Sequence, residues 1–320
     1  MNVRYCIILL CLYICKNVLN HMRIKDVIDI PSEKLSSGFS TALRICKKIK
    51  GSKDTSDIID FSYARFVTPT FILPLLIYIK KTGSDKRIFI EHADGYLKSI
   101  CFDQFGVNSG MMRKSEFTAF LEQFSKKRYI PLISFPATCN RLEDKNDIMS
   151  VIESMIVKQS GLEQNIVSGI KYMLGEIADN ISEHSKSAFG YILAQCYPTS
   201  KYIDICIGDT GITLLGSYAD APDCEIASDG EAMRAANSGI STKNLPDAEN
   251  RGYGISTTRK MLVEGLGGQY MMVSGDTVYV NTRAGSGYFE LPDGIRFEGT
   301  IVALRIPYGD EKFRYINYIE

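Results

Sequence analysis

Four short segments in the C-terminal half of the chain carry residue types suited to binding a nucleotide. The first, residues 175–184, reads Gly-Glu-Ile-Ala-Asp-Asn-Ile-Ser-Glu-His. Asp-Thr-Gly follows at 209–211, Gly-Tyr-Gly at 252–254 and Gly-Thr at 299–300. Each fragment alone is common in proteins. Their order within about one domain length indicates a single site assembled from several elements.

The first segment lies on a predicted amphipathic helix over residues 162–184. Its Glu176 and Asn180 are one helical turn apart and therefore share a face. An amide oxygen at Asn180 suits Mg²⁺, and a carboxylate at Glu176 can orient or deprotonate a water near a terminal phosphate. A solvated helix flank is the plain alternative. His184, a further turn along, is left open between a phosphate contact and a packing residue.

The second segment follows an alternating strand pattern over residues 201–207. A buried carboxylate at Asp209 can accept a hydrogen bond from the amino group of adenine. Gly211 lacks the Cβ that would block the base. An Asx turn is the plain alternative for Asp209. Asp-Thr-Gly also occurs in aspartic proteases, but a single copy in these surroundings argues against that activity.

The last two segments suit the phosphate end and the closing strand of such a site. Gly252 and Gly254 open a predicted helix, whose free N–H groups and dipole favour an anion. The spacing is neither Gly-x-Gly-x-x-Gly nor a Gly-Lys-Ser/Thr loop, which disfavours Rossmann and P-loop sites. The long polar stretch before Gly252 is expected to form a lid, with Lys243 as a candidate phosphate contact. Thr300 begins a strand.

Taken together, these segments resemble the GHKL ATPase superfamily, which includes DNA gyrase, the heat-shock ninety chaperones, MutL and histidine kinases. The resemblance covers residues 145–308 and implies Mg²⁺ and ATP as cofactors. Glu176 would be the catalytic base and Asn180 the metal ligand. Residues 209–213 depart from the pattern, because many members have a second glycine there. The nucleotide would be bound by Asp209, Gly211, Gly252, Gly254 and Thr300.

The N-terminal half alternates predicted strands and helices from Met22 to about residue 136. A strand at 57–61 and the Phe-Val-Thr-Pro-Thr stretch at 66–70 resemble, more faintly, a STAS domain, the fold of anti-sigma-factor antagonists. That family often has a phosphorylatable serine followed by glycine at this helix entrance. Here Thr68 or Thr70 occupies the region, and a structural threonine N-cap is the favoured interpretation.

The expected fold is α/β in two domains. A STAS-like domain over residues 22–136 precedes a GHKL α/β sandwich over 145–308, with helices on one face of a mixed sheet, and 309–320 form a tail. Residues 1–21 are an apolar leader of signal-peptide length. The favoured interpretation is an annotation extension with translation starting at Met22, and a membrane anchor is the alternative.

Composition excludes several functional classes. The chain has 37 basic and 37 acidic residues, so no global field attracts nucleic acid. Its nine cysteines form no Cys-x-x-Cys pair, which favours reduced thiols in a cytoplasmic protein. Three histidines far apart in sequence do not favour a histidine-based metal cluster.

These observations predict a regulatory Mg-ATP-binding protein, an ATP-dependent switch or protein kinase of the anti-sigma or two-component type. A protein partner is expected to bind through the STAS-like domain, and a homodimer is left open. A membrane partner is expected only if residues 1–21 are a real anchor. Two alternatives remain, a lid-gated ATPase that drives dimerisation and a non-catalytic nucleotide sensor.

Overall fold

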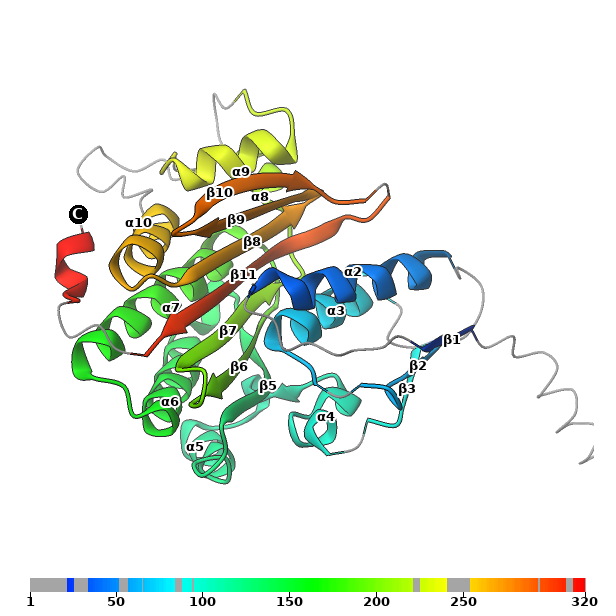
Figure 1. Ribbon diagram of the computed structural model, residues 1–320, viewed down its shortest axis with the longest axis horizontal. Helices are drawn as coiled ribbons and strands as arrows, with labels where there is room; N and C mark the ends of the chain where they lie inside the picture. The colour runs from blue at the N-terminus through cyan, green and yellow to red at the C-terminus, as the bar shows by residue number, and fades with distance from the viewer. Residues whose placement is uncertain are drawn as a thin grey trace, which may run out of the picture.

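The computed structural model contains two β-sheets (Figure 1). The smaller is parallel, with strand order β1 (Met22–Lys25), β2 (Asp57–Asp60) and β3 (Ile88–Glu91). The structure describes residues 22–25, 34–51, 57–64, 66–83, 88–93, 95–220, 225–240, 254–292, 294–308 and 313–319.

The larger sheet has eight strands in the order β10-β9-β8-β11-β7-β6-β5-β4. Neighbouring strands are antiparallel except for β4 and β5, which are parallel. The α/β class and the mixed sheet are therefore confirmed. The strands are β4 (Val107–Asn108), β5 (Tyr129–Pro136), β6 (Phe189–Tyr197), β7 (Tyr202–Asp209), β8 (Gln269–Gly275), β9 (Thr277–Thr282), β10 (Gly285–Glu290) and β11 (Phe297–Pro307).

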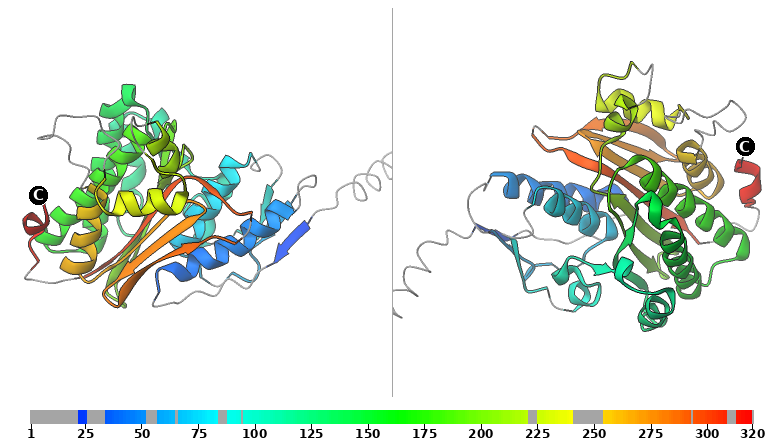
Figure 2. Two further views of the ribbon diagram at one scale, coloured as in Figure 1. Left: turned by 90° about the horizontal axis from the view of Figure 1, so that it is seen from above. Right: turned by 180° about the vertical axis from the view of Figure 1, so that it is seen from behind.

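Helices cover both faces of the eight-stranded sheet (Figure 2), whereas the expectation was one face. One face packs against α6 (Leu142–Ser160), α7 (Gln164–His184) and α10 (Gly254–Lys260), which a π-helical turn continues. The other packs against α2 (Ser36–Gly51) and α3 (Pro69–Lys81). The central strands carry apolar side chains on both faces, so helices must pack on each face to bury them.

Helix α3 is the centre of the second layer. Its residues from Pro69 to Ile79 are all buried, as expected for a helix that is apolar all round. It packs between α2 and strands β6, β7 and β11. Pro69 at the first helical turn costs no hydrogen bond, because that N–H has no partner within a helix.

The eight-stranded sheet includes residues on both sides of the domain boundary expected near residue 136. Strands β4 and β5 come before that position, yet β5 is hydrogen-bonded to β6 along its length. The short helices α4 (Tyr96–Ser99) and α5 (Lys114–Glu122) flank this edge (Figure 1). The N-terminal half therefore contributes both to the sheet and to the helices that cover it.

The two threonines at the start of α3 are buried beneath α2. Thr68 is the N-cap residue by position, but its hydroxyl makes no capping hydrogen bond within the described chain. Instead it lies 3.0 Å from the Thr70 hydroxyl, and both pack against Gly38. The favoured interpretation of a threonine N-cap is therefore wrong, and the two hydroxyls instead pack at the contact between α2 and α3. A kinase could reach either hydroxyl only if α2 moved away.

Among the described residues, no helix is both long enough and apolar enough to cross a bilayer. The leader at residues 1–21 lies outside the described residues, so neither interpretation of it is tested.

Replacing Gly38 by alanine should destabilise the protein. The added Cβ would lie 2.6 Å from the Thr70 hydroxyl and 3.1 Å from the Phe71 amide nitrogen, which are fixed by the helix entrance. Overpacking of this kind costs about 1–3 kcal/mol. Urea unfolding of Gly38→Ala measures that loss.

Gly51 is the matched control, because it ends the same helix and a Cβ there meets no described atom within 4 Å. Gly51→Ala should be neutral or slightly stabilising. Equal stability of the two variants would contradict the tight packing of α2 on α3.

Candidate functional site

A cavity of about 320 Å³ opens beside α7, on the sheet face opposite α3. Its walls come from α7, α10, α8 (Leu214–Ala219) and α9 (Asp229–Asn237), and its floor from the central strands. Lys243 and Gly252, two predicted phosphate contacts, lie outside the described residues. The predicted residues that line the cavity are Glu176, Asn180, His184, Asp209, Gly254 and Thr300.

One end of the cavity joins α7 to the start of α10. Glu176 and Asn180 are half-buried on the cavity side of α7. The Glu176 carboxylate lies against Gly254, and a Cβ on Gly254 would collide with its Oε2. Glycine at 254 is therefore required for this approach. The arrangement sets a carboxylate, an amide and the first residue of a helix side by side.

The other end of the cavity holds Asp209, which is 1% exposed. Its Oδ1 accepts a hydrogen bond of 2.7 Å from the Gly211 amide, and its Oδ2 accepts one of 3.3 Å from the Thr300 amide. Burial raises the pKa of Asp209 to about 7, although these two amides and the Lys81 ammonium act to lower it. The Asp209 carboxyl group is therefore harder to ionise than an exposed aspartate.

Two glycines permit close backbone contacts around the Asp209 turn. Gly299 has φ of +119°, and a Cβ there would collide with the Asp209 carbonyl oxygen. Gly211 has a different role from the one expected. A Cβ on it would meet the Ser185 carbonyl group at the end of α7, not a base in the cavity. The Ile212 amide donates to that same oxygen over 2.7 Å, which fixes the turn against α7.

The two ends of the cavity are separated along α7. Ser185, beside the Asp209 turn, follows Glu176 by nine residues, which corresponds to about 13 Å of helix. The floor consists mainly of apolar side chains from the sheet. The cavity therefore combines a carboxyl acceptor, a helix start and a mainly apolar floor. The floor residues are Ile207, Tyr270, Met272 and Val302.

Sequence reasoning did not single out Thr258, although its side chain also lines the cavity. Thr258 is 1% exposed, and its hydroxyl has no hydrogen-bond partner within the described chain. An unpaired buried hydroxyl beside a cavity is available to a ligand or a water. Its position four residues after Gly254 on α10, one turn along the same face, is the signal that could have identified it.

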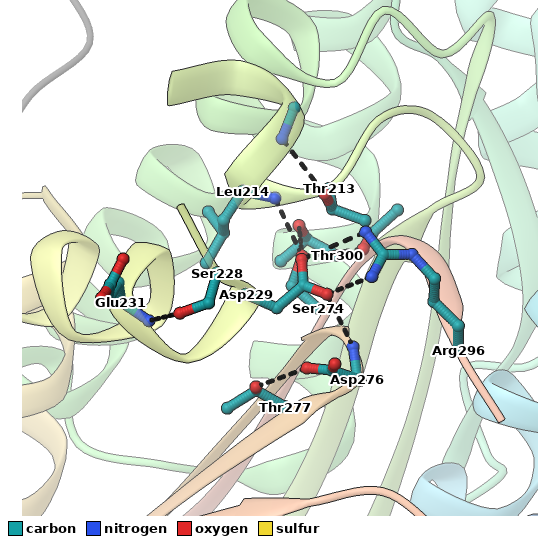
Figure 3. A network of polar contacts seen from close by, with 12 residues as sticks. Thr213, Leu214, Ser228, Asp229, Glu231, Ser274, Asp276, Thr277, Arg296 and Thr300 are labelled. Carbon is teal, nitrogen blue, oxygen red and sulfur yellow. Dashed lines mark hydrogen bonds and ion pairs between the residues drawn. The ribbon is translucent and has the colours of Figure 1, made fainter. Parts of the chain in front are cut away.

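The Thr300 hydroxyl belongs to a polar network that holds the start of α8 (Figure 3). Ser274 on β8 lies 3.2 Å from it, donates to the Gly299 carbonyl over 3.0 Å and accepts from the Leu214 amide over 2.9 Å. Thr213 caps α8 by accepting from the Gly216 amide over 3.1 Å. The network joins the cavity wall to the two strands beneath it.

Asp229 holds the start of α9 in the same region (Figure 3). Its buried carboxylate binds the Arg296 guanidinium through two hydrogen bonds, and it accepts from the Asp276 amide over 3.1 Å. On the far side, the Tyr218 hydroxyl of α8 donates to the Ile240 carbonyl over 2.6 Å. These contacts position the helices that enclose the cavity.

A separate group of possible metal ligands lies at the ends of β2 and β3. One ligand atom each from Asp60, Glu91 and His92 lies within 4.8 Å of the others. Asp60 Oδ1 is already engaged by His92 Nδ1 at 2.7 Å and by the Ser62 amide at 3.0 Å. None of the three lines the cavity, so this group plays no part in the candidate site.

No protein-family model matches this sequence, and no curated protein matches it at a significant level. The interpretation of the cavity therefore depends on its own geometry. That geometry brings a buried carboxyl group, an amide, a helix start and a threonine together from four separate segments.

The raised pKa of Asp209 predicts a pH dependence of stability. The native state keeps a proton that the unfolded chain loses above about pH 4, so this carboxyl destabilises the protein increasingly up to about pH 7. Relative to Asp209→Asn, the wild-type free energy of unfolding should fall across that window, by at most about 1.4 kcal/mol per pH unit, and level off above it. Denaturant titrations at pH 4.5, 6 and 8 measure it.

Asp144→Asn is the control for that titration, because Asp144 forms an exposed ion pair with Arg141. Its stability difference from wild type should change little over the same window. A flat difference for Asp209→Asn as well would show that Asp209 titrates normally.

Removing the Asp229 carboxylate should loosen α9. Asp229→Asn leaves the Arg296 guanidinium without its counter-ion, and we expect a loss of about 1–3 kcal/mol, less than for a fully buried pair because the Arg296 side chain is 43% exposed. Hydrogen exchange of α9 should increase. Asp220→Asn, which breaks an exposed pair with Lys186, is the control and should cost under about 1 kcal/mol. Unchanged exchange in α9 would show that the ion pair does not hold this helix.

Proposed function

We propose that the protein binds Mg-ATP in the cavity beside α7 and acts as an ATP-dependent regulatory switch or protein kinase of the anti-sigma or two-component type. The single observation that carries this proposal is convergence. Glu176, Asn180, Asp209, Gly254 and Thr300 come from four separated segments, and all line one cavity. A chance set of common motifs has no reason to meet in one place.

The two ends of the cavity suit the two ends of the nucleotide. The adenine amino group would donate to Asp209, and the apolar floor would take the base. The phosphates would lie toward Gly254, where the start of α10 offers N–H groups. The separation of about 13 Å along α7 leaves room for the sugar between them.

The residues on α7 fit a metal-bound triphosphate. Asn180 would supply a neutral oxygen to Mg²⁺, and the metal, when bound, neutralises charge on the phosphates. Glu176 would orient or deprotonate the attacking hydroxyl, which belongs either to water or to a partner protein. The contact of its carboxylate with Gly254 supports this role, because the phosphates would lie at that end of the cavity.

The regulatory role is supported by the N-terminal layer. Helices α2 and α3 pack directly on the sheet that forms the floor of the cavity, so a protein bound to the N-terminal half could influence the site. We further propose action in the cytoplasm. The five described cysteines Cys46, Cys101, Cys139, Cys196 and Cys206 are all free thiols, as in a reducing compartment.

The test compares wild type with Glu176→Ala and Asn180→Ala, using γ-labelled ATP with and without Mg²⁺. We expect ATP binding in wild type, weaker Mg²⁺-dependent binding in Asn180→Ala, and a loss of turnover of at least about tenfold in Glu176→Ala with binding retained. Label on a protein indicates a kinase, free phosphate an ATPase, and binding without turnover a sensor.

Glu163→Gln and Asn165→Ala are matched controls, because both residues lie on or beside the same helix and neither lines the cavity. Both should behave as wild type. Absence of ATP binding by wild type, or identical behaviour of Asn180→Ala and Asn165→Ala, would refute the proposed site.

A further inference from the structure

Helix α3 ends on the turn that holds Asp209. The ammonium group of Lys81, the last residue of α3, lies 3.0 Å from the Thr210 carbonyl oxygen and 3.4 Å from that of Gly211. These are the two residues that follow Asp209, and the Gly211 amide donates to the Asp209 carboxylate. Lys81 therefore donates hydrogen bonds to the carbonyl oxygens of the turn that holds the Asp209 carboxyl group.

Lys81 also contacts the second segment that reaches Asp209. Its ammonium group lies 3.5 Å from Glu298 Oε2, directly before Gly299 and Thr300. The Thr300 amide is the other hydrogen-bond donor to Asp209. Lys81 thus contacts the backbone of one segment that holds this carboxylate and, through the Glu298 side chain, the residue that precedes Gly299 in the other.

The contact comes from a different part of the chain. Every described residue that lines the cavity lies at or after Glu176, whereas Lys81 belongs to the layer on the opposite face of the sheet. Helix α3 is buried between α2 and the central strands up to Ile79, so the backbone of its last turn is held against the sheet. The Lys81 side chain is about one-third exposed and that of Glu298 more than half exposed, so water screens the ion pair and Lys81 holds the turn mainly through the two carbonyl oxygens.

We propose that Lys81 is a positioning residue for base recognition, which ties the geometry of the Asp209 turn to the N-terminal helical layer. This inference rests on the proposed function, because it assigns regulation to the same cavity. Lys81 does not itself line the cavity, so it acts through the Thr210 and Gly211 carbonyls. A shift of α3 would then alter the acceptor that the base meets.

The expected consequence is a loss of discrimination between bases. Adenine presents an amino donor where guanine presents a carbonyl oxygen, so a fixed carboxylate at Asp209 favours adenine. Without Lys81 the Asp209 turn can relax, and the ratio of the affinity for ATP to that for GTP should fall. If Lys81 only stabilised the fold, its removal would instead weaken the binding of ATP and of GTP by the same factor.

The experiment uses the full chain and three variants, Lys81→Met, Lys81→Arg and Lys80→Met. Lys80 is the matched control, because it is the preceding residue of α3 and lies over the Phe105 ring, 5.3 Å from its centroid. Titration calorimetry gives the dissociation constants for ATP and GTP. We expect Lys81→Met to weaken ATP binding about three- to tenfold with a smaller effect on GTP. Lys81→Arg should restore most of the preference, and Lys80→Met should match wild type.

Two outcomes separate this inference from the proposed function. If wild type binds no ATP, both fail. If wild type prefers ATP and Lys81→Met keeps the same ratio of affinities as Lys80→Met, the positioning role fails and the nucleotide site stands. If Lys81→Met does not fold, Lys81→Gln is measured in its place with the same criterion.

Discussion

The architecture around the cavity depends on one buried carboxylate and the two backbone amides that hold it. Asp209 is almost fully buried, and burial without hydrogen bonds would be costly. Gly211 and Thr300 supply those bonds. The Gly211 amide reaches Asp209 through a local turn that packs against the end of α7, whereas the Thr300 amide comes from β11, which approaches Asp209 closely at Gly299. The glycines at 211 and 299 make these approaches sterically allowed.

The two halves of the chain pack closely because the central sheet is apolar on both faces. The central strands β7 and β11 present apolar side chains to both faces, and the second face is covered by α2 and α3. Besides Asp209, the central strands bury one further pair of charged residues, Asp204 and Arg305. They face each other across the β7–β11 pair and form two hydrogen bonds, of 2.7 and 2.8 Å. A charge at that depth is tolerated because its partner lies directly opposite.

Much of this could be predicted from local sequence patterns. The apolar stripe predicted a helix over 162–184, and α7 spans Gln164–His184. Alternation predicted the strand over 201–207, where β7 spans Tyr202–Asp209. The set of residues facing one cavity was also largely predictable, because Glu176 and Asn180 are spaced by one turn and Asp209 ends a strand.

What local pattern could not supply was contact between distant segments. The pairing of β5 with β6 and the cover provided by α3 depend on long-range fit, which a single-sequence pattern does not carry. Strand β10 reads Gly-Ser-Gly-Tyr-Phe-Glu and is largely exposed, so it has no apolar alternation to detect. The true neighbour of Gly211, the Ser185 carbonyl group, was hidden for the same reason.

The burial of α3 on the sheet also limits how this protein could be divided or recombined. A segment that began at α6 would carry the cavity-lining residues but would expose Leu193, Cys206 and Ala303 to water, because α3 normally covers them. Such a segment would tend to aggregate, since a broad apolar sheet face is a ready surface for self-association. A segment for gene fusion or domain exchange should therefore begin before α2. Substitutions in α3 are expected to correlate with substitutions in the sheet residues that it covers.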